Sequence, residues 1–187
     1  FFQAEDAIRD PLWSRGLGDV YKRQILVLLL ISVLGMFLNS CGERALRIYK
    51  GPEVTRIEVF KKERILLVYH KDEILKKYPI DLGFGPKGPK QFEGDGKTPE
   101  GKYIINKHNP NSAFHLSLGI SYPDAKDIEF AESLGKSPGG DIFIHGHPNN
   151  GKKQGPDWTA GCIAVKDKHI RELYQMIKVN TQIEIFP

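Results

Sequence analysis

The sequence predicts a mostly β domain, a sandwich or a barrel, with two peripheral helices. Three observations support this prediction. From Val54 onward, short apolar runs recur between turns that are charged or rich in Gly and Pro, as in a series of connected strands. Only two stretches have helical periodicity, and the chain contains no internal repeat. The length of 187 residues, with 40% hydrophobic and 27% charged residues, suits one globular domain with short appendages.

The expected strands follow one another along the chain and are joined by polar turns. Val54–Phe60 and Ile65–His70 flank a charged turn, which favours a hairpin, and Ile74–Leu82 continues the meander. Apolar and polar residues alternate over Ser112–Ser121, so we expect one buried and one exposed face there. The remaining strands are expected at Lys102–Asn106, Asp141–His145 and Thr181–Phe186.

Two helices and one long loop complete the predicted architecture. In Asp124–Leu134, Asp124 is placed to cap the N-terminus and Gly135 follows as a stop signal. A second helix is expected to have Asp167 as its N-cap. Residues 83–101 contain nine Gly or Pro among nineteen residues, which is typical of a functional or mobile loop. The apolar stripe of the second helix consists of Ile170, Leu173, Tyr174 and Ile177.

Residues 25–41 carry no charge and are predicted to be an export signal. Their apolar part, 25–38, would span about 21 Å as a helix, which is short of the ~30 Å bilayer core. The segment Leu38–Cys41 that follows resembles the lipobox of bacterial lipoproteins. The resemblance implies an exported, periplasmic protein with a lipid anchor on Cys41. Because Gly42 is not Asp, we expect the outer membrane of a Gram-negative bacterium; an ordinary secretory signal or a terminal anchor helix is the alternative.

The two flanking segments are expected to lie outside the domain. Residues 1–24 have no clear period and resemble a translated sequencing-adapter read-through, in agreement with the missing initial Met. If they are native, we expect a disordered cytoplasmic tail. Residues 42–53 are expected to form a linker, which leaves 54–187 as the catalytic domain. The formal net charge of +4 comes without a run of Lys and Arg, so we expect no nucleic-acid partner.

Residues 142–165 carry the strongest chemical signal. Cys162 follows Gly161 and precedes an apolar run, a setting in which a thiol can be exposed while backbone N–H groups converge on a developing oxyanion. His145 ends an expected strand seventeen positions earlier, and His is the usual base for a Cys nucleophile. Taken alone, a Cys and a His are weak evidence, because a lone Cys is more often a buried small hydrophobic residue.

Two motifs together make the resemblance specific. The pair His145–Gly146, followed after a gap by Thr159–Cys162, resembles the catalytic motif of the L,D-transpeptidase (YkuD) domain. The segment Gly94–Tyr103 is similar to the G-x-x-x-T-P-x-G-x-Y segment of the same family. The resemblance covers about 54–187 and implies an L,D-transpeptidase-like β-sandwich or barrel.

The resemblance also implies roles for individual residues. Cys162 is expected to form a thioester with peptidoglycan stem peptides and pass it to an amine acceptor, with His145 as base and then acid. The Gly146 carbonyl would be the third group, and the N–H groups of Gly161 and Cys162 would form the oxyanion hole. No cofactor or metal is implied. Ala160 stands where the family has His, which affects the acceptor side rather than the thiol chemistry.

Several further residues are candidates for substrate binding, and four of them have a plainer structural interpretation. The candidates are Asp157, Trp158, Thr159, His115 and Tyr122. Asp157 could instead brace the catalytic loop, Trp158 could belong to the core, and His115 and Tyr122 could lie on a polar strand face. His147, which forms a His-x-His pair with His145, suggests a metal site together with Asp157, but no third ligand has suitable spacing.

Four functional hypotheses remain open from the sequence. The first is the transpeptidase, expected to be a monomer attached to the membrane by its lipid. The second is a peptidoglycan hydrolase or amidase that uses the same Cys–His pair. The third is a non-catalytic, lipid-anchored peptidoglycan-binding module that retains the fold. The last is a metallopeptidase.

Overall fold

The computed structural model describes residues 23–28 and 48–187. Residues 23–28 form a short helix that belongs to a unit of its own, and no helix in either described range is long and apolar enough to cross a membrane. Most of the expected export signal, with Cys41, and nearly all of residues 1–24 lie outside the described residues. All that follows concerns the unit that contains 48–187.

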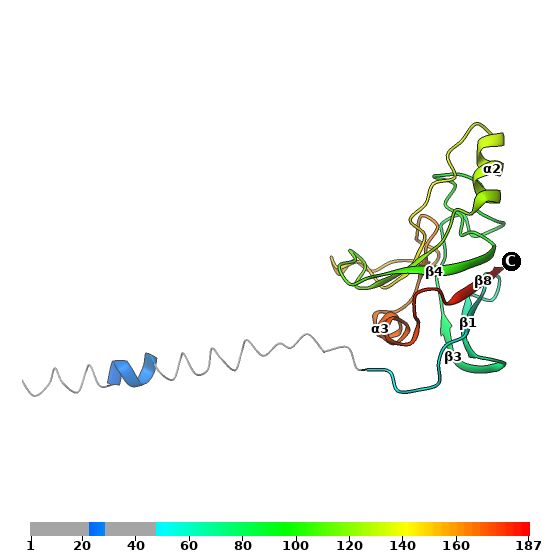
Figure 1. Cartoon of the computed structure of the whole chain (residues 1–187). Helices are drawn as coiled ribbons and strands as arrows, with labels where there is room; N and C mark the ends of the chain where they lie inside the picture. Colours follow the sequence, from blue (N-terminus) through cyan, green and yellow to red (C-terminus); the bar gives the residue numbers. More distant parts are fainter. Residues whose placement is uncertain (1–22, 29–47) are drawn as a thin grey trace, which may run out of the picture. The chain divides into compact units, whose positions relative to one another are not determined.

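This unit is built around a single eight-stranded sheet with two helices (Figure 1). Its strand order is β3-β2-β1-β8-β4-β5-β6-β7, and only the pairs β1–β8 and β6–β7 are parallel. The mostly β prediction is therefore confirmed. The strands are β1 (Arg56–Phe60), β2 (Ile65–His70), β3 (Glu73–Pro79), β4 (Gly101–Asn109), β5 (Ser117–Ile120), β6 (Phe143–His145), β7 (Ile163–Ala164) and β8 (Gln182–Phe186).

The sheet curls until its two ends meet. Asp81, two residues after β3, pairs with Ala164 of β7: each N–H donates to the other's carbonyl, at 2.9 and 2.8 Å. One step further along, the Thr159 N–H donates to the Leu82 carbonyl at 3.1 Å, and Phe84 N–H donates to the Thr159 carbonyl at 2.8 Å. The architecture is thus a curled, barrel-like sheet and not two stacked sheets.

The inside of the curl is packed with aliphatic side chains from the strands and from helix α3 (Asp167–Met176). Ile170 and Leu173 of α3 are fully buried, and Ile177, just after the helix, is 1% exposed. Burial of one such side chain contributes about 1.5–3 kcal/mol. The predicted stripe of this helix is confirmed, although Tyr174 is only partly buried at its margin.

The two helices differ in how they begin. Helix α2 (Ala125–Ser133) has the predicted cap, because the Asp124 carboxylate accepts from the N–H groups of Lys126 and Asp127 at 2.8 and 2.9 Å. The prediction for α3 is wrong: its N-cap is Lys166, which makes no side-chain cap bond. Asp167 is the first helical residue, and its carboxylate bonds outside the helix, to the His147 N–H.

The prediction that buried and exposed residues alternate over 112–121 is also wrong. Strand β5 covers only Ser117–Ile120, and all four of its residues are buried. Side chains of Asn106 and Lys107 on the neighbouring strand cover Gly119, so both faces of β5 are shielded from water. Residues 113–116 form turns and bends instead of strand.

The long loop 83–101 is tied to β1 by an ion pair. Lys61, in the turn after β1, is only 2% exposed, and its Nζ donates to the Gly88 and Thr98 carbonyls and to Glu100 Oε1, at 2.6, 2.9 and 2.7 Å. All three donor positions of the ammonium are used. A loop whose composition alone is compatible with mobility is therefore fixed at Gly88 and again near its end, at Thr98 and Glu100.

We predict that Lys61→Met lowers the free energy of unfolding by about 2–3 kcal/mol, because it leaves the Glu100 carboxylate and two carbonyls without their donor. Urea unfolding followed by circular dichroism measures the change. The matched control is Lys62→Met, since Lys62 is exposed. An equal loss in the two variants would contradict the role given to the Lys61 network.

Candidate active site

His145 and Cys162 line one open cleft of about 490 Å³. The parallel register pairs His145 with Ala164, and Ile144 with Ile163, so Cys162 follows as the neighbour of Phe143. Adjacent strands thus bring together two residues that are seventeen positions apart. The other lining residues are Lys107, Asn109, Ser112, Ala113, Phe114, Ser117, Asp141 and Phe143.

The partly buried Cys162 contributes its thiol to the lining of this cleft. Its Sγ donates to the Asp141 carbonyl and accepts from the Phe143 N–H, both at 3.4 Å. Burial raises the pKa of the Cys162 thiol above its ordinary value, although the Phe143 N–H opposes the rise. At neutral pH the resting group is therefore a thiol and not a thiolate.

The imidazole of His145 is held in one tautomer. Its Nδ1 lies 2.7 Å from the Gly146 carbonyl oxygen. Because a carbonyl oxygen can only accept, Nδ1 must carry the hydrogen, and Nε2 then presents a lone pair. His145 is 3% exposed, and this burial lowers the pKa of its imidazole below the ordinary value. The group is thus a neutral base at neutral pH.

Aromatic rings shield this base from water. The ring of Phe114 lies 4.6 Å from that of His145, and the ring of Trp158 lies 5.5 Å away in an edge-on arrangement. Trp158 and Phe114 also contact each other, at 5.8 Å. Desolvation by these neighbours favours the uncharged imidazole, in agreement with the lowered pKa.

The backbone around Cys162 is arranged by Thr159. Its hydroxyl donates to the Cys162 carbonyl at 2.7 Å and accepts from the Gly161 N–H at 3.2 Å. The Gly161 N–H is therefore engaged within the turn. By contrast, the Cys162 N–H has no acceptor in the described part of the chain. Of the two oxyanion donors expected from the sequence, Cys162 N–H is the one that stands free.

Gly161 is required by the loop behind it. Its φ is +134°, and an added Cβ would lie 2.7 Å from the Lys97 carbonyl oxygen. No other residue fits such a conformation and such an approach. The second half of loop 83–101 thus packs directly against the residue before Cys162.

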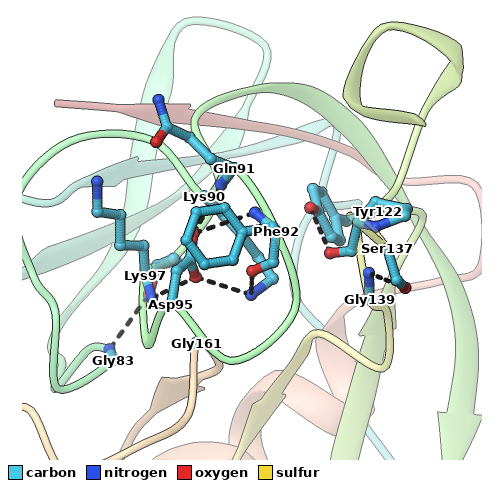
Figure 2. A network of polar contacts seen from close by, with 12 residues as sticks. Gly83, Lys90, Gln91, Phe92, Asp95, Lys97, Tyr122, Ser137, Gly139 and Gly161 are labelled. Atoms are coloured by element: carbon cyan, nitrogen blue, oxygen red, sulfur yellow. Dashed lines mark hydrogen bonds and ion pairs between the residues drawn. The ribbon is translucent and has the colours of Figure 1, made fainter. Parts of the chain in front are cut away.

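Figure 2 shows what orders that loop. The Asp95 carboxylate accepts from the N–H groups of Gln91 and Lys97, at 2.7 and 3.0 Å, and from Lys90 Nζ at 3.0 Å. The Lys90 and Asp95 side chains are 3% and 4% exposed. Burial would raise the pKa of Asp95, but these donors outweigh it and lower the pKa. The segment Gly94–Tyr103 therefore has a structural role behind Cys162.

Asp157 braces the loop that precedes Cys162. Its carboxylate takes two bonds from the Arg64 guanidinium, at 2.9 and 2.7 Å, and one from the Leu82 N–H at 3.0 Å. Burial alone would raise the pKa of Asp157, but the guanidinium and the N–H lower it. This arrangement matches the bracing interpretation of Asp157.

None of the five residues predicted to bind substrate is among those that line the cleft. Asp157 and Thr159 organise the loop, and Trp158 packs on His145. The His115 Nε2 accepts from Arg171 of α3 at 2.9 Å, and the buried Tyr122 donates its hydroxyl to the Pro138 carbonyl at 2.9 Å.

The two residues considered for a metal site have separate partners. The ring of His147 lies 3.4 Å from Asp167, whereas Asp157 is bonded to Arg64. They do not form a common site.

The sequence did not indicate some of the residues that line the cleft, such as Lys107 and Phe143. They belong to no recognisable motif, and only the strand order places them in the same cleft as the thiol.

Two curated proteins are similar to this chain in sequence. The chain is 30% identical over 144 residues to YafK of Escherichia coli K12, with 70% of this chain and 53% of YafK covered. It is 28% identical over 132 residues to YkuD of Bacillus licheniformis, with 71% of this chain and 66% of that protein covered.

Two solved structures superpose on this chain. The helical cell shape determining protein Pgp2 of Campylobacter jejuni superposes with a TM-score of 0.58 at 27% identity, covering 79% of this chain and 52% of Pgp2. Bd1075 of Bdellovibrio bacteriovorus superposes with a TM-score of 0.53 at 27% identity, and the match covers 75% of this chain and 51% of Bd1075. The chain spans about half the length of YafK, Pgp2 and Bd1075. The model of the L,D-transpeptidase catalytic domain (YkuD) matches residues 54–185, and the chain therefore belongs to that family.

Proposed function

We propose that this chain is a cysteine acyltransferase of the L,D-transpeptidase type that acts on peptidoglycan stem peptides. One observation carries the proposal: the thiol of Cys162 and the neutral, Nδ1-protonated imidazole of His145 line the same cleft. Family membership supports the stem peptide as substrate class. The name of Pgp2 refers to helical cell shape, which suggests that remodelling of the wall by this chain affects shape.

The chemistry follows from the resting charges. His145 Nε2 takes the thiol proton as Sγ attacks a stem-peptide carbonyl, so that no ion pair has to be maintained before substrate binds. The oxyanion that forms accepts a bond from the free Cys162 N–H. The imidazolium then gives its proton to the departing amine, and a thioester remains. Attack by an acceptor amine on the thioester forms the new amide and restores the thiol.

The lining of the cleft suits a peptide that carries carboxylates. Lys107 lies at its rim, with its Nζ 4.8 Å from the centre of the Phe143 ring and 3.7 Å from Asp141. We propose that Lys107 binds a stem-peptide carboxylate and that Phe114 and Phe143 contact its aliphatic parts.

Hydrolysis of the same thioester is the second candidate. Ala160 is exposed beside the nucleophile, at the position where the family motif has His. A small residue there leaves room for water on the acceptor side. Both outcomes use the same thiol and base, and they differ only in whether water or an amine takes the acyl group.

We also propose that the chain works at the membrane, in the periplasm, attached through acylated Cys41. The support for this is the sequence of residues 25–42 alone. A lipid anchor would keep the domain close to the peptidoglycan that it modifies.

Removal of the nucleophile tests the reaction. We predict that Cys162→Ala lowers turnover of purified muropeptides at least about a thousandfold. Mass spectrometry of the products separates new cross-links from shortened stems. Full activity in the variant would exclude the thiol mechanism. Loss of wild-type activity with a chelator would favour a metallopeptidase, and binding without turnover would favour a wall-binding module.

The pH dependence tests the resting state. Because the pKa of His145 is lowered, its base form persists below the ordinary imidazole value of about 6.5, and kcat/KM should fall only at more acidic pH. Because the pKa of Cys162 is raised, iodoacetamide should alkylate it more slowly than glutathione at pH 7.5. Alkylation faster than that of glutathione would indicate a preformed thiolate.

The anchor is tested by expression in a Gram-negative host. We predict that Cys41→Ser abolishes the mass increase of a diacylglyceryl group and moves the protein from the detergent phase to the aqueous phase. Cys162→Ser is the matched control and should stay lipid-modified. Aqueous partitioning of the unchanged chain would show that Cys41 is not acylated.

A further inference from the structure

The peptide group between Gly146 and His147 lies between the catalytic base and a carboxylate. Its carbonyl oxygen, on Gly146, accepts from His145 Nδ1 at 2.7 Å. Its N–H, on His147, donates to Asp167 Oδ1 at 2.8 Å. Both groups belong to one planar amide, so the imidazole, the amide and the carboxylate form a continuous chain of hydrogen bonds.

The surroundings hold this peptide group in place. An added Cβ on Gly146 would lie 2.7 Å from Asp167 Oδ1 and 3.0 Å from the Phe114 carbonyl oxygen, so glycine is needed for the carboxylate to approach. The Gly146 N–H donates to the same Phe114 carbonyl at 3.0 Å. Asp167 is the first residue of α3, and that helix is anchored in the core by its buried stripe.

We propose that Asp167 is a positioning residue for His145 and that it acts through the Gly146–His147 peptide group; this inference rests on the proposed function. A carboxylate that accepts from an amide N–H polarises the amide and makes its carbonyl a stronger acceptor. The stronger bond to Nδ1 keeps the hydrogen on that atom and Nε2 free for the thiol proton. It also stabilises the positive charge that develops on His145.

The side chain of His147 offers a competing explanation. Its Nδ1 lies 3.4 Å from the same Asp167 oxygen, so the carboxylate could serve only to hold that ring. The two roles are separable, because removal of the His147 ring leaves the peptide N–H in place.

Steady-state kinetics on muropeptides distinguish the two roles. We expect Asp167→Asn to lower kcat about tenfold and Asp167→Ala about a hundredfold, with KM within about twofold of wild type, as for other groups that orient a catalytic ligand. His147→Ala should lower kcat less than about twofold. Exposed Glu129 supplies the charge control, Glu129→Gln, which should leave kcat unchanged. A loss in His147→Ala equal to that in Asp167→Ala would overturn the proposal, as would unchanged kcat in Asp167→Ala.

A spectroscopic measurement tests the proposal without turnover. In Cys162→Ala protein with ¹⁵N-labelled histidine, we expect a slowly exchanging, downfield proton on His145 Nδ1. Adding Asp167→Ala should move it upfield and speed its exchange. An unchanged resonance would overturn the role of Asp167. If the wild-type protein neither turns over stem peptides nor forms a thioester, the proposed function fails. The resonance of the His145 Nδ1 proton still decides whether Asp167 acts on His145 through the chain of hydrogen bonds.

Discussion

The pairing of Asp81 with Ala164 is the contact on which the rest of the site depends. It joins the two ends of the strand order and turns an open sheet into a curled one. The same join carries the Leu82–Thr159 bond and the Asp157 bonds, so the segment before Cys162 is held by residues about eighty positions earlier. Without that join, β7 would be an unsupported edge of two residues, and nothing would fix the thiol beside His145.

Burial determines the charge states of Cys162 and His145. A partly buried thiol and a shielded imidazole both favour their uncharged forms, so Cys162 and His145 do not form an ion pair with each other at rest. The polar groups that orient His145 and that await an oxyanion are backbone amides: the Gly146 carbonyl, the His147 N–H and the Cys162 N–H. Most of the orientation in this site therefore comes from main-chain geometry, which explains why glycines stand at 146 and 161.

Features encoded by neighbouring residues were predictable from the sequence, whereas features that depend on distant contacts were not. The turn between β1 and β2 and the caps of α2 involve residues within a few positions, and both were predicted. Burial of both faces of β5 depends on side chains from β4, and the place of Phe143 and Lys107 in the cleft depends on strand order. Asp is a residue type that commonly caps the N-terminus of a helix. The Asp167 carboxylate instead accepts a hydrogen bond from the N–H of His147, which lies in another segment. For Cys162 and His145, the motif indicated the pair, while the charge states required burial that no local pattern encodes.

The parallel pairing of β1 with β8 has a consequence for the order of assembly. These are the first and last strands of the described domain, joined in register from Arg56–Gln182 to Phe60–Phe186. High contact order of this kind postpones closure of the sheet until the whole domain has been synthesised. A nascent chain that stops before β8 contains Cys162 and His145 but lacks the finished scaffold that places them in one cleft. The proposed acyl transfer would therefore begin only after β8 has been synthesised.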